Sequence, residues 1–458
     1  MTPKLRYRVL SSILLMSARL VGQNDLSIYG LNNLFQQTYV NPAYLPKSNV
    51  QVGLPVMSSV YLNAQHSGFS YGQLLGSGSS SIDPERIAKA LGKRNILSVD
   101  FQTDLFSLGI KSRRTYFSVS LTEKVHTNFI YPKTLASFFL QGNGDPSTLG
   151  KRVSFDDLGF NLKAYHELAF GVSMPVTRSL RVGARFKYLM GLVNVQTKRS
   201  TLGITTDPDT YALTVDGGLL VRTAGIQQLT GPDAENDLVA YVSKPQSNSG
   251  FGIDLGVEYS LTPKLSFQGS LINLGSIRWK TDAVQYEQTN IRYTFDAVDL
   301  DDLTGDGFGT EMQARIDSLS SLLNLQEKRE AYSTGLNPIF IAGTRFQLNE
   351  SNAISGLVRL EWIERFVRPS LAAFYHFGIN NWLGANFMYS YQNRSAVNLG
   401  GAFTVKFLPF QWYIATDNFL VALSPQLSKT AQIRTGINFV FGGKQLKKIK
   451  MPKFEKES

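Results

Sequence analysis

The 458-residue chain contains no cysteine, which excludes disulfide bonds and cysteine-based metal or redox chemistry. Histidine is scarce too, and the spacing of His66, His126, His166 and His376 matches no known metal-ligand motif. Absence of cysteine is compatible with passage through an oxidising compartment without a need for disulfides. We therefore expect no metal site and no cofactor.

Long apolar runs are also missing. A transmembrane helix needs about 20 mostly apolar residues. The nearest candidate, residues 407–423, contains Pro409 and Asp417 and is rich in strand-forming residues. Near the N-terminus, a short apolar stretch at residues 9–16 follows several basic residues. This order is typical of a secretory signal peptide, which we predict over residues 1–22.

The net charge of +11 raises the question of an acidic partner. Nucleic-acid binding would require a basic stripe or a known module, and the sequence shows neither. We therefore expect no nucleic-acid partner, and a surface that is solvated or faces an acidic lipid layer.

What the sequence does contain is a repeated two-residue rhythm. Every second residue from Leu180 to Met190 is apolar, whereas the residues between them include Arg181, Arg185 and Lys187. A β-strand shows alternate side chains to opposite faces, so this segment is apolar on one face and cationic on the other. The same rhythm recurs at 117–129, 158–172, 251–261 and 432–441.

These segments are about 10–15 residues long, whereas a globular strand has about 5–6 and a membrane-crossing barrel strand about 9–11. Short turns alternate with long polar insertions, as in outer-membrane barrels. We therefore predict an all-β fold, a transmembrane antiparallel β-barrel of about fourteen strands. The predicted strands lie near 50–62, 97–110, 115–130, 156–173, 180–192, 250–262, 265–279, 338–348, 353–363, 366–377, 382–392, 396–407, 411–420 and 431–441.

The segment 211–222 also resembles a strand, and counting it as spanning leads to the alternative of sixteen strands. A spanning strand there would put a short turn on the wrong side, so we place it in an outside hairpin. Short helices are predicted in two outside insertions, at 83–95 and 311–330. Residues 302–313 partly match a calcium-binding loop, but Thr304 and Gln313 break the pattern, so an ordinary acidic loop is favoured.

Four segments follow from this layout: the signal peptide at 1–22, a periplasmic or lumenal segment at 23–48, the barrel at 49–441 and a basic periplasmic tail at 442–458.

Charged residues fall on the face that we predict to line the barrel lumen. In the hairpin turning at 175–179, Glu167 would lie opposite Arg185 or Lys187 across the two strands, a favourable pair. Two interpretations stay open: charge pairing that fills the barrel, which the mixed signs favour, and a selectivity surface for an anionic or amphipathic solute. The predicted row comprises Lys163, Glu167, Arg181, Arg185, Lys187, Asp254, Glu258, Arg359 and Glu361, with Arg345, Arg368, Lys406, Asp417 and Arg434 as further inward charges.

Catalysis is not expected. A lipase-type barrel would need serine, histidine and an orienting partner near the lipid boundary. His166 falls on the predicted lipid face, but its neighbouring strand offers only Ala184, Phe186 and Tyr188 there. We therefore predict that the chain is not an enzyme.

Three stretches carry a resemblance. "VNPAYLPKSNVQVGLP" (40–55), "AYHELAFGVSMPVTRSLRVGARFKYLMGL" (164–192) and "LINLGSIRW" (271–279) resemble a family of Bacteroidetes outer-membrane barrels of undefined function. The Asn-Pro-Ala opening is similar to that of barrels associated with type IX secretion and gliding motility. The strand count is similar to that of long-chain fatty-acid transporters. The resemblance implies an outer-membrane location and a lumenal hatch formed by 23–48, with Asn41, Pro42 and Tyr44 at the corner entering the first strand.

The pattern and the resemblance together favour a channel or transporter for small or amphipathic solutes in the outer membrane. The alternative is a structural or docking component of an envelope or secretion assembly, with the insertion at 280–337 contacting another envelope protein. Outer-membrane lipid is the expected partner in either case.

Overall fold

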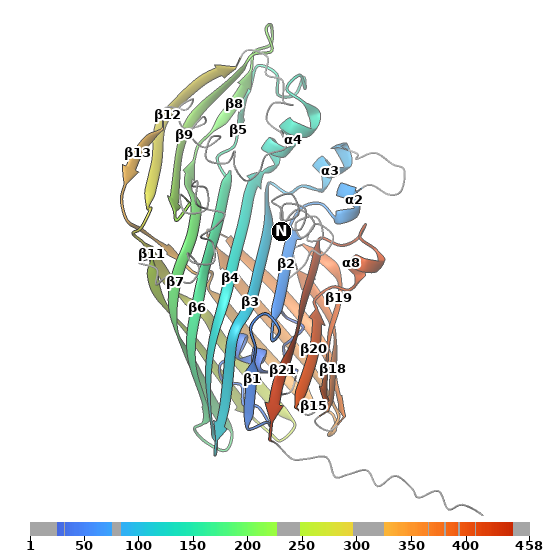
Figure 1. The fold of residues 1–458 in the computed structure, drawn as a ribbon. Helices are drawn as coiled ribbons and strands as arrows, with labels where there is room; N and C mark the ends of the chain where they lie inside the picture. The colour runs from blue at the N-terminus through green and yellow to red at the C-terminus, as the bar shows by residue number, and fades with distance from the viewer. Residues whose placement is uncertain are drawn as a thin grey trace, which may run out of the picture.

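The computed structural model describes residues 25–31, 33–75, 84–226, 248–295, 325–364, 366–379, 382–392, 394–407 and 409–442. Its strands form one continuous antiparallel sheet, shown in Figure 1. The sheet closes on itself, because the first strand, β1 (Val50–Gly53), pairs with the last, β21 (Thr430–Phe441). The prediction of an all-β barrel of about fourteen strands is confirmed, and the sixteen-strand alternative is not realised.

The ring starts with β1 and β2, which share the same two neighbours and act as one interrupted strand. The other strands of the ring are β3 (Arg94–Ser112), β4 (Thr115–Pro132), β6 (Gly159–Pro175), β7 (Leu180–Ser200), β10 (Ser249–Ser260), β11 (Leu265–Trp279), β15 (Ile339–Gln347), β16 (Asn352–Ile363), β17 (Phe366–Ile379), β18 (Leu383–Gln392), β19 (Ser395–Phe407), β20 (Phe410–Thr416) and β21. No helix in the described part of the chain has the length and apolar character needed to cross a membrane.

The first strand departs from the prediction of one strand over 50–62. It breaks after Gly53 and resumes at β2 (Val60–His66). Between them the chain bulges outward at Val56, which adopts a left-handed φ of 61° and is 56% exposed. The bulge remains tied to the wall, since the Val56 amide donates to the carbonyl of Asp104.

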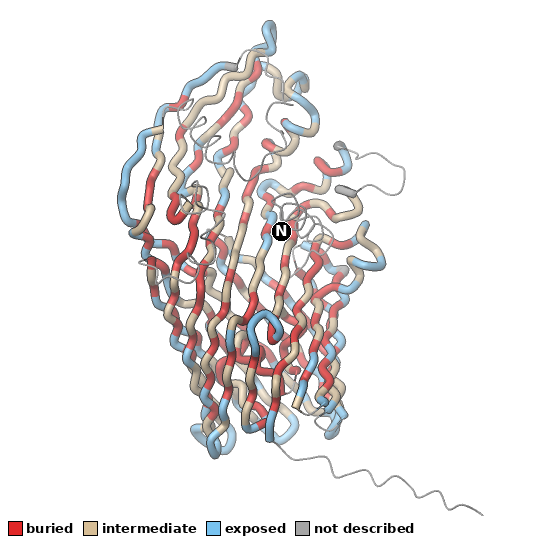
Figure 2. Tube along the Cα trace, viewed as in Figure 1, coloured by how far each residue is buried: buried red, intermediate tan, exposed pale blue. Residues whose placement is uncertain are grey.

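The outer surface of the barrel carries a broad belt of exposed apolar side chains. Figure 2 shows buried and exposed residues alternating along the strands of the barrel wall. On β10 the outward side chains from Phe251 to Leu261 are exposed, a length that matches a membrane-crossing barrel strand. The belt includes Phe117, Phe170, Phe186, Phe267, Phe346, Ile354, Trp362, Val367, Leu371, Tyr375, Phe387, Tyr389, Tyr391, Leu399, Phe403, Phe407, Phe410 and Trp412. Apolar area on this scale around a closed sheet is suited to hydrocarbon rather than to water.

His166 lies on this outer face, as the alternation predicts, but it is not alone there. Its imidazole forms an ion pair with Glu123 of the neighbouring strand β4. Arg278 of β11 is exposed on the same row of cross-strand partners. His166 pairs with Met190, Met190 with Ser249, and Ser249 with Arg278. These polar side chains interrupt the outward apolar face, which continues past them with Val99 and Phe160.

Beyond that level, a second set of strands continues the sheet away from the belt (Figure 1). We call this set the extension. The predicted outside strand is present as β9, although at 213–224 rather than 211–222, and it pairs with β7, β8 and β12. The extension consists of β5 (Arg152–Ser154), β8 (Gly203–Thr206), β9 (Leu213–Ala224), β12 (Val284–Phe295), β13 (Gln326–Arg329) and β14 (Tyr332–Gly335).

The two predicted helices agree with the structure only in part. The helix expected over 83–95 is α3 (Pro84–Ala90), which ends early because the chain turns at Gly92 and enters β3. The helix predicted over 311–330 is wrong at its C-terminal end, where β13 pairs with β12 instead. The start of that helix and the 302–313 loop lie outside the described residues.

Three short helices had no counterpart in the predictions: α2 (Tyr71–Leu75), α4 (Lys133–Gln141) and α8 (Leu420–Leu423). The apolar side of α4 packs through Leu135 and Phe138 against Ile87 and Leu91, which belong to the α3 segment. Helices α3 and α4 therefore share a small core with β4, β5 and β8, to which Tyr131, Val153 and Ile204 contribute, at the end of the barrel where the long loops lie.

Residues 25–49 lie within the barrel, from Asp25 beside Arg434 to Asn49, whose amide donates to the Phe441 carbonyl at the end that carries the short turns. We call residues 25–44, which include the 3-10 helix η1 (Phe35–Tyr39), the plug. Leu26, Ile28 and Leu34 are almost completely buried in a cluster with wall residues such as Leu357 and Phe374. The plug thus fills much of the lumen with an apolar core of its own.

The corner of the plug rests on two glycines of the wall. Gly183 and Gly256 lie opposite each other on β7 and β10. A Cβ at Gly183 would come within 2.1 Å of the Pro42 carbonyl oxygen, and one at Gly256 within 2.2 Å of the Asn41 amide oxygen. The corner can approach the wall only because neither position has a side chain. Tyr44 follows the corner and is half-buried.

The face assignment of β7 predicts a depth-dependent cost of charge. Ala184 pairs with Leu255 at the middle of the belt, whereas Leu180 pairs with Tyr259 near its lower edge. We expect Ala184→Arg to lower the unfolding free energy by about 2–4 kcal/mol and Leu180→Arg by about 0–1 kcal/mol. Equilibrium unfolding in lipid vesicles measures both, and equal costs at the two positions would contradict the assignment.

The corner contact predicts that Gly183→Ala displaces the plug. Because the obstructing atoms belong to the Pro42 backbone, we expect a loss of about 1–3 kcal/mol and faster proteolysis of residues 25–44. Gly356→Ala is the matched control, since its Cβ would meet only ordinary contacts at 3.9 Å. Unchanged protection of the plug in Gly183→Ala would refute the contact.

Candidate functional site: a charged cavity inside the barrel

A network of buried ion pairs joins β4, β6, β7 and β10 inside the barrel. Asp254 accepts from Lys187 at 2.7 Å and from Arg185 at 3.0 Å. Glu167 lies 2.8 Å from the Lys124 ammonium and 3.3 Å from that of Lys187. All five side chains are buried or nearly so, and ions in such a place require partners of opposite charge.

The sequence predicts this meeting of charges but not its register. Glu167 lies opposite Leu189 instead of Arg185 or Lys187, so it contacts both basic residues diagonally. The reason is the turn, whose closing pair is Pro175 with Arg181. With this closing pair, each residue of β6 lies opposite a residue of β7 that is later in the sequence than predicted, so Glu167 meets Leu189.

A bulge in β11 completes the network. The pairing of β10 with β11 shifts between Ile253 and Leu255, and Asn273 adopts a left-handed φ of 61°. Its side-chain oxygen accepts from Lys187 at 2.7 Å, and its backbone amide donates to Asp254 at 2.7 Å. The sequence analysis missed Asn273. Its one available signal was the tolerance of asparagine for positive φ.

A second group of charges lies across the lumen on β16 and β17. Glu361 accepts from Arg359 at 3.1 Å and from the Arg368 Nε at 3.2 Å. A third pair links wall and plug, because Arg434 of β21 bonds Asp25 at 2.6 Å. Arg434 was predicted to point inward; its partner in the plug was not foreseen.

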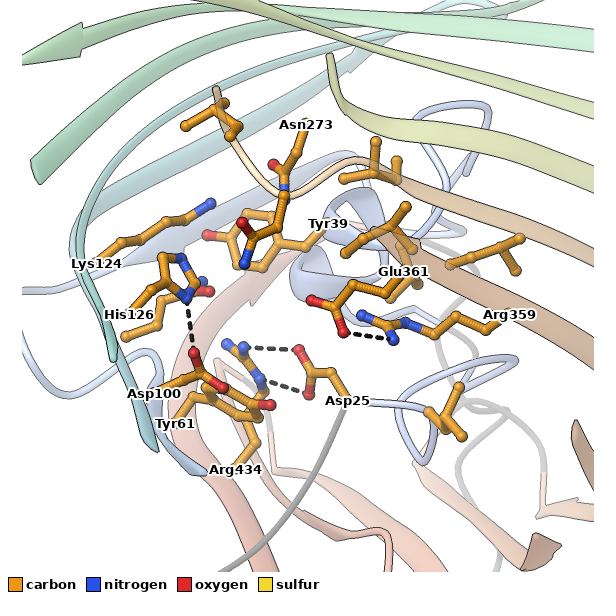
Figure 3. Close-up of a pocket in the computed structure, with 18 of the residues that line it drawn as sticks. Asp25, Tyr39, Tyr61, Asp100, Lys124, His126, Asn273, Arg359, Glu361 and Arg434 are labelled. Atoms are coloured by element: carbon orange, nitrogen blue, oxygen red, sulfur yellow. Dashed lines mark hydrogen bonds and ion pairs between the residues drawn. The ribbon is translucent and has the colours of Figure 1, made fainter. Parts of the chain in front are cut away.

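These groups surround a partly open cavity of about 110 Å³ inside the barrel (Figure 3). Figure 3 shows Lys124 on one side of the cavity and Arg359 with Glu361 on another. Lys163, Arg185 and Lys187 also belong to the lining. The lining holds six basic and three acidic side chains. Counting the bonded partners Glu167, Asp254 and Arg368 as well leaves an excess of two positive charges.

The wall between β11 and β16 gives the cavity an aliphatic surface beside Arg359 and Glu361. This surface consists of Ile272, Leu336, Ile339, Ile341 and Leu357. The plug closes the cavity with Leu26, Tyr29, Tyr39 and Val40, together with Asp25. The cavity is therefore amphipathic, with a cationic side, an aliphatic side and a boundary formed by the plug.

Not every residue of the predicted row reaches this cavity. Arg181 and Glu258 pair with each other at 2.9 Å, nearer the short-turn end and outside the cavity lining. Lys163 does line the cavity, where its ammonium bonds the carbonyl of Gly335. His126 and Asp100, which bond at 2.8 Å, also line it and were not predicted as site residues.

The plug is fixed by polar bonds as well as by packing. The Asp417 carboxylate accepts from the backbone amides of Leu26, at 3.1 Å, and Ser27, at 2.8 Å. The Asn386 side chain donates to the Ser27 carbonyl at 2.7 Å. Inward polar side chains of the wall therefore satisfy the plug backbone, which forms no strand with the barrel.

One arrangement resembles part of a hydrolase site. Ser355 Oγ and His376 Nε2 lie 2.6 Å apart beneath the plug. However, His376 Nδ1 has no hydrogen-bond partner among the described residues, and the neighbouring charge is the cation of Arg345. The pair therefore lacks the acid of a catalytic triad. No cluster of three or more potential metal ligands occurs in the described part of the chain.

Comparison with solved structures finds other barrels. The Ralstonia pickettii toluene transporter TbuX aligns at 10% identity and a TM-score of 0.46, covering 93% of this chain and 100% of that one. The Pseudomonas putida toluene transporter TodX aligns at 10% and 0.40, covering 92% and 95%, and a Pseudomonas aeruginosa FadL homologue at 9% and 0.39, covering 92% and 96%. At these scores the similarities carry no inference about a substrate of this chain.

No curated protein matches the sequence. A family model does, over residues 42–417, which begin at Pro42 of the plug corner and include thirteen strands of the ring. The chain therefore belongs to DUF5723, a family of unknown function.

Proposed function

We propose that the protein is an outer-membrane transporter for small amphipathic solutes, with preference for anions. The apolar belt supports the membrane placement, because it spans the closed sheet at the length a bilayer requires. The short turns, the start of β1 and the end of β21 all lie at the same end of the barrel, which we assign to the periplasm. The extension and the helices would then face the exterior, as longer loops do in such barrels.

The amphipathic cavity is the observation that carries this proposal. A solute with an anionic group would meet the cationic side at Lys163 and Arg185, and its apolar part would meet Ile341 and Leu357. A cavity of 150 Å³ can hold a molecule such as benzene, so about 110 Å³ suits only a small solute in the closed state.

The plug is the element that must move. It forms one boundary of the cavity, and its contacts to the wall are an apolar cluster, the Arg434–Asp25 ion pair and the hydrogen bonds to Asp417 and Asn386. No strand pairing joins it to the sheet within the described residues. Displacement of the plug therefore opens the cavity without breaking the β-ladder of the barrel.

A tether between plug and wall tests this movement. Because the chain has no cysteine, Ser27→Cys with Asn386→Cys introduces a single thiol pair at the point where the Asn386 side chain donates to the Ser27 backbone carbonyl at 2.7 Å. We expect the oxidised protein in liposomes to be silent in solute uptake, and reduction to restore uptake. The wall pair Ser98→Cys with Asn128→Cys, which face each other on β3 and β4, serves as control. Uptake through the oxidised plug tether would disprove the mechanism.

The preference for anions has its own test. Lys163 bonds a carbonyl rather than a carboxylate, and Glu364, the acid with which its charge interacts, also accepts from Asn161 and Gln196. Lys163→Gln therefore removes one lumenal charge and leaves Glu364 with hydrogen-bond donors. We expect uptake of a small amphipathic carboxylate to fall several-fold, while uptake of its neutral amide stays unchanged. Lys198→Gln, exposed in the upper part of β7, is the control. Equal effects on both solutes would contradict a selectivity role.

A docking role in an envelope or secretion assembly is the second candidate. The specific observation in its favour is the extension, whose outer strand β13 is fully exposed within the 280–337 insertion. Under this alternative the reconstituted barrel is silent even with a free plug, and the protein is recovered from membranes with a stoichiometric partner. Recovery of the barrel alone, together with solute uptake, favours transport.

A further inference from the structure

A second concave site lies where the wall of β17 and β18 meets the start of β3. It is an open groove of about 540 Å³, separate from the lumenal cavity. Its lower part consists of Val367, Pro369 and Tyr391, which are exposed on the outward face of the barrel. Its lining includes four basic residues, of which Arg368 is paired with Glu361. The other three, Lys93, Arg94 and Arg394, form its upper part and are hereafter the rim cations. The groove is therefore apolar on the membrane side and cationic above it.

The rim cations are not neutralised by the protein. Arg94 forms an ion pair with Asp157, and neither Lys93 nor Arg394 has an acidic partner among the residues that the structure describes. Three basic groups and one carboxylate leave an excess of two positive charges. All three basic residues are exposed, so this excess is available to a ligand.

Local packing holds the three groups together. The Arg94 guanidinium lies 5.6 Å above the ring of Phe366, and an Arg394 Nη1 donates to the Arg94 carbonyl at 3.5 Å. Arg394 itself adopts a left-handed φ of 58° in the β18–β19 turn. Gly92 leaves room for this approach, because a Cβ there would lie 2.1 Å from Arg394 Nη1. Segments far apart in the sequence thus place their charges at one point of the rim.

We propose that this groove binds the phosphorylated headgroup of a lipid in the outer leaflet. A phosphate carries the one to two negative charges that the rim cations leave unmatched, and arginine provides charge-assisted hydrogen bonds to its oxygens. The acyl chains lie along Val367, Pro369 and Tyr391, which already face hydrocarbon in the belt. A soluble anion would use the cations but leave this apolar part unexplained. The inference relies on the membrane placement proposed above and not on transport.

Lipid binding can be measured on the purified protein in non-ionic detergent by native mass spectrometry. The probes are dioctanoyl phosphatidic acid, dioctanoylglycerol and glycerol 3-phosphate, which together separate the phosphate from the acyl chains. We expect the wild type to bind the phosphatidic acid about tenfold or more tightly than either of the other two. Lys93→Gln with Arg394→Gln should lose about tenfold in affinity for the phosphatidic acid and leave dioctanoylglycerol unchanged.

A charge-matched control comes from the part of the chain beyond the belt. Lys151→Gln with Lys198→Gln removes two exposed lysines away from the groove and should bind like the wild type. The single variant Lys93→Gln should show a smaller loss of the same selectivity, which guards against misfolding of the double variant. Phosphatidic acid affinity that is equal in the rim and control variants would overturn the proposal. So would glycerol 3-phosphate binding as tightly as the lipid, because that result assigns the groove to a soluble anion. Solute uptake by the rim variant separates a failure of this proposal from a failure of the transport proposal.

Discussion

Closure of the sheet is the constraint on which the rest of this structure depends. In hydrocarbon every backbone amide and carbonyl must be bonded within the protein, so a sheet that crosses a bilayer can leave no edge. The chain meets this condition by pairing β1 and β2 with β21 on one side and with β3 on the other. Once the ring is closed, the alternation of side chains divides each strand between an apolar exterior and a polar interior.

A polar interior creates a second requirement, because charges removed from water need partners. Asp254 and Glu167 share Arg185 and Lys187, and Glu167 also bonds Lys124. Asn273 bonds both an acid and a base of that network. The excess of positive charge around the cavity is thereby reduced but not removed. This residual positive charge beside an aliphatic surface distinguishes the cavity from a barrel lumen in which all charges are paired with one another.

The plug combines both requirements. Its apolar side chains bury themselves against inward residues of β15 to β18, whereas its backbone is satisfied by wall side chains such as Asp417 and Asn386. Contacts made by side chains rather than by a β-ladder can break locally without opening the ring. The same contrast applies at the rim, where loops, and not the ladder, bring Lys93 and Arg394 together.

The sequence by itself determined the fold class, the number of strands and the faces of the alternating strands. An alternation of period two depends only on the residues within a strand, and closure of the ring leaves it unchanged. It also determined that Glu167 and Asp254 share a face with Arg185 and Lys187. Only the tertiary structure decided which of them touch. The turn at 176–179 set the register, the bulge at Asn273 bent β11 toward the network, and the plug supplied Asp25 to Arg434. These contacts join residues up to several hundred positions apart, and their geometry depends on turn length, bulges and ring closure, which no local pattern encodes.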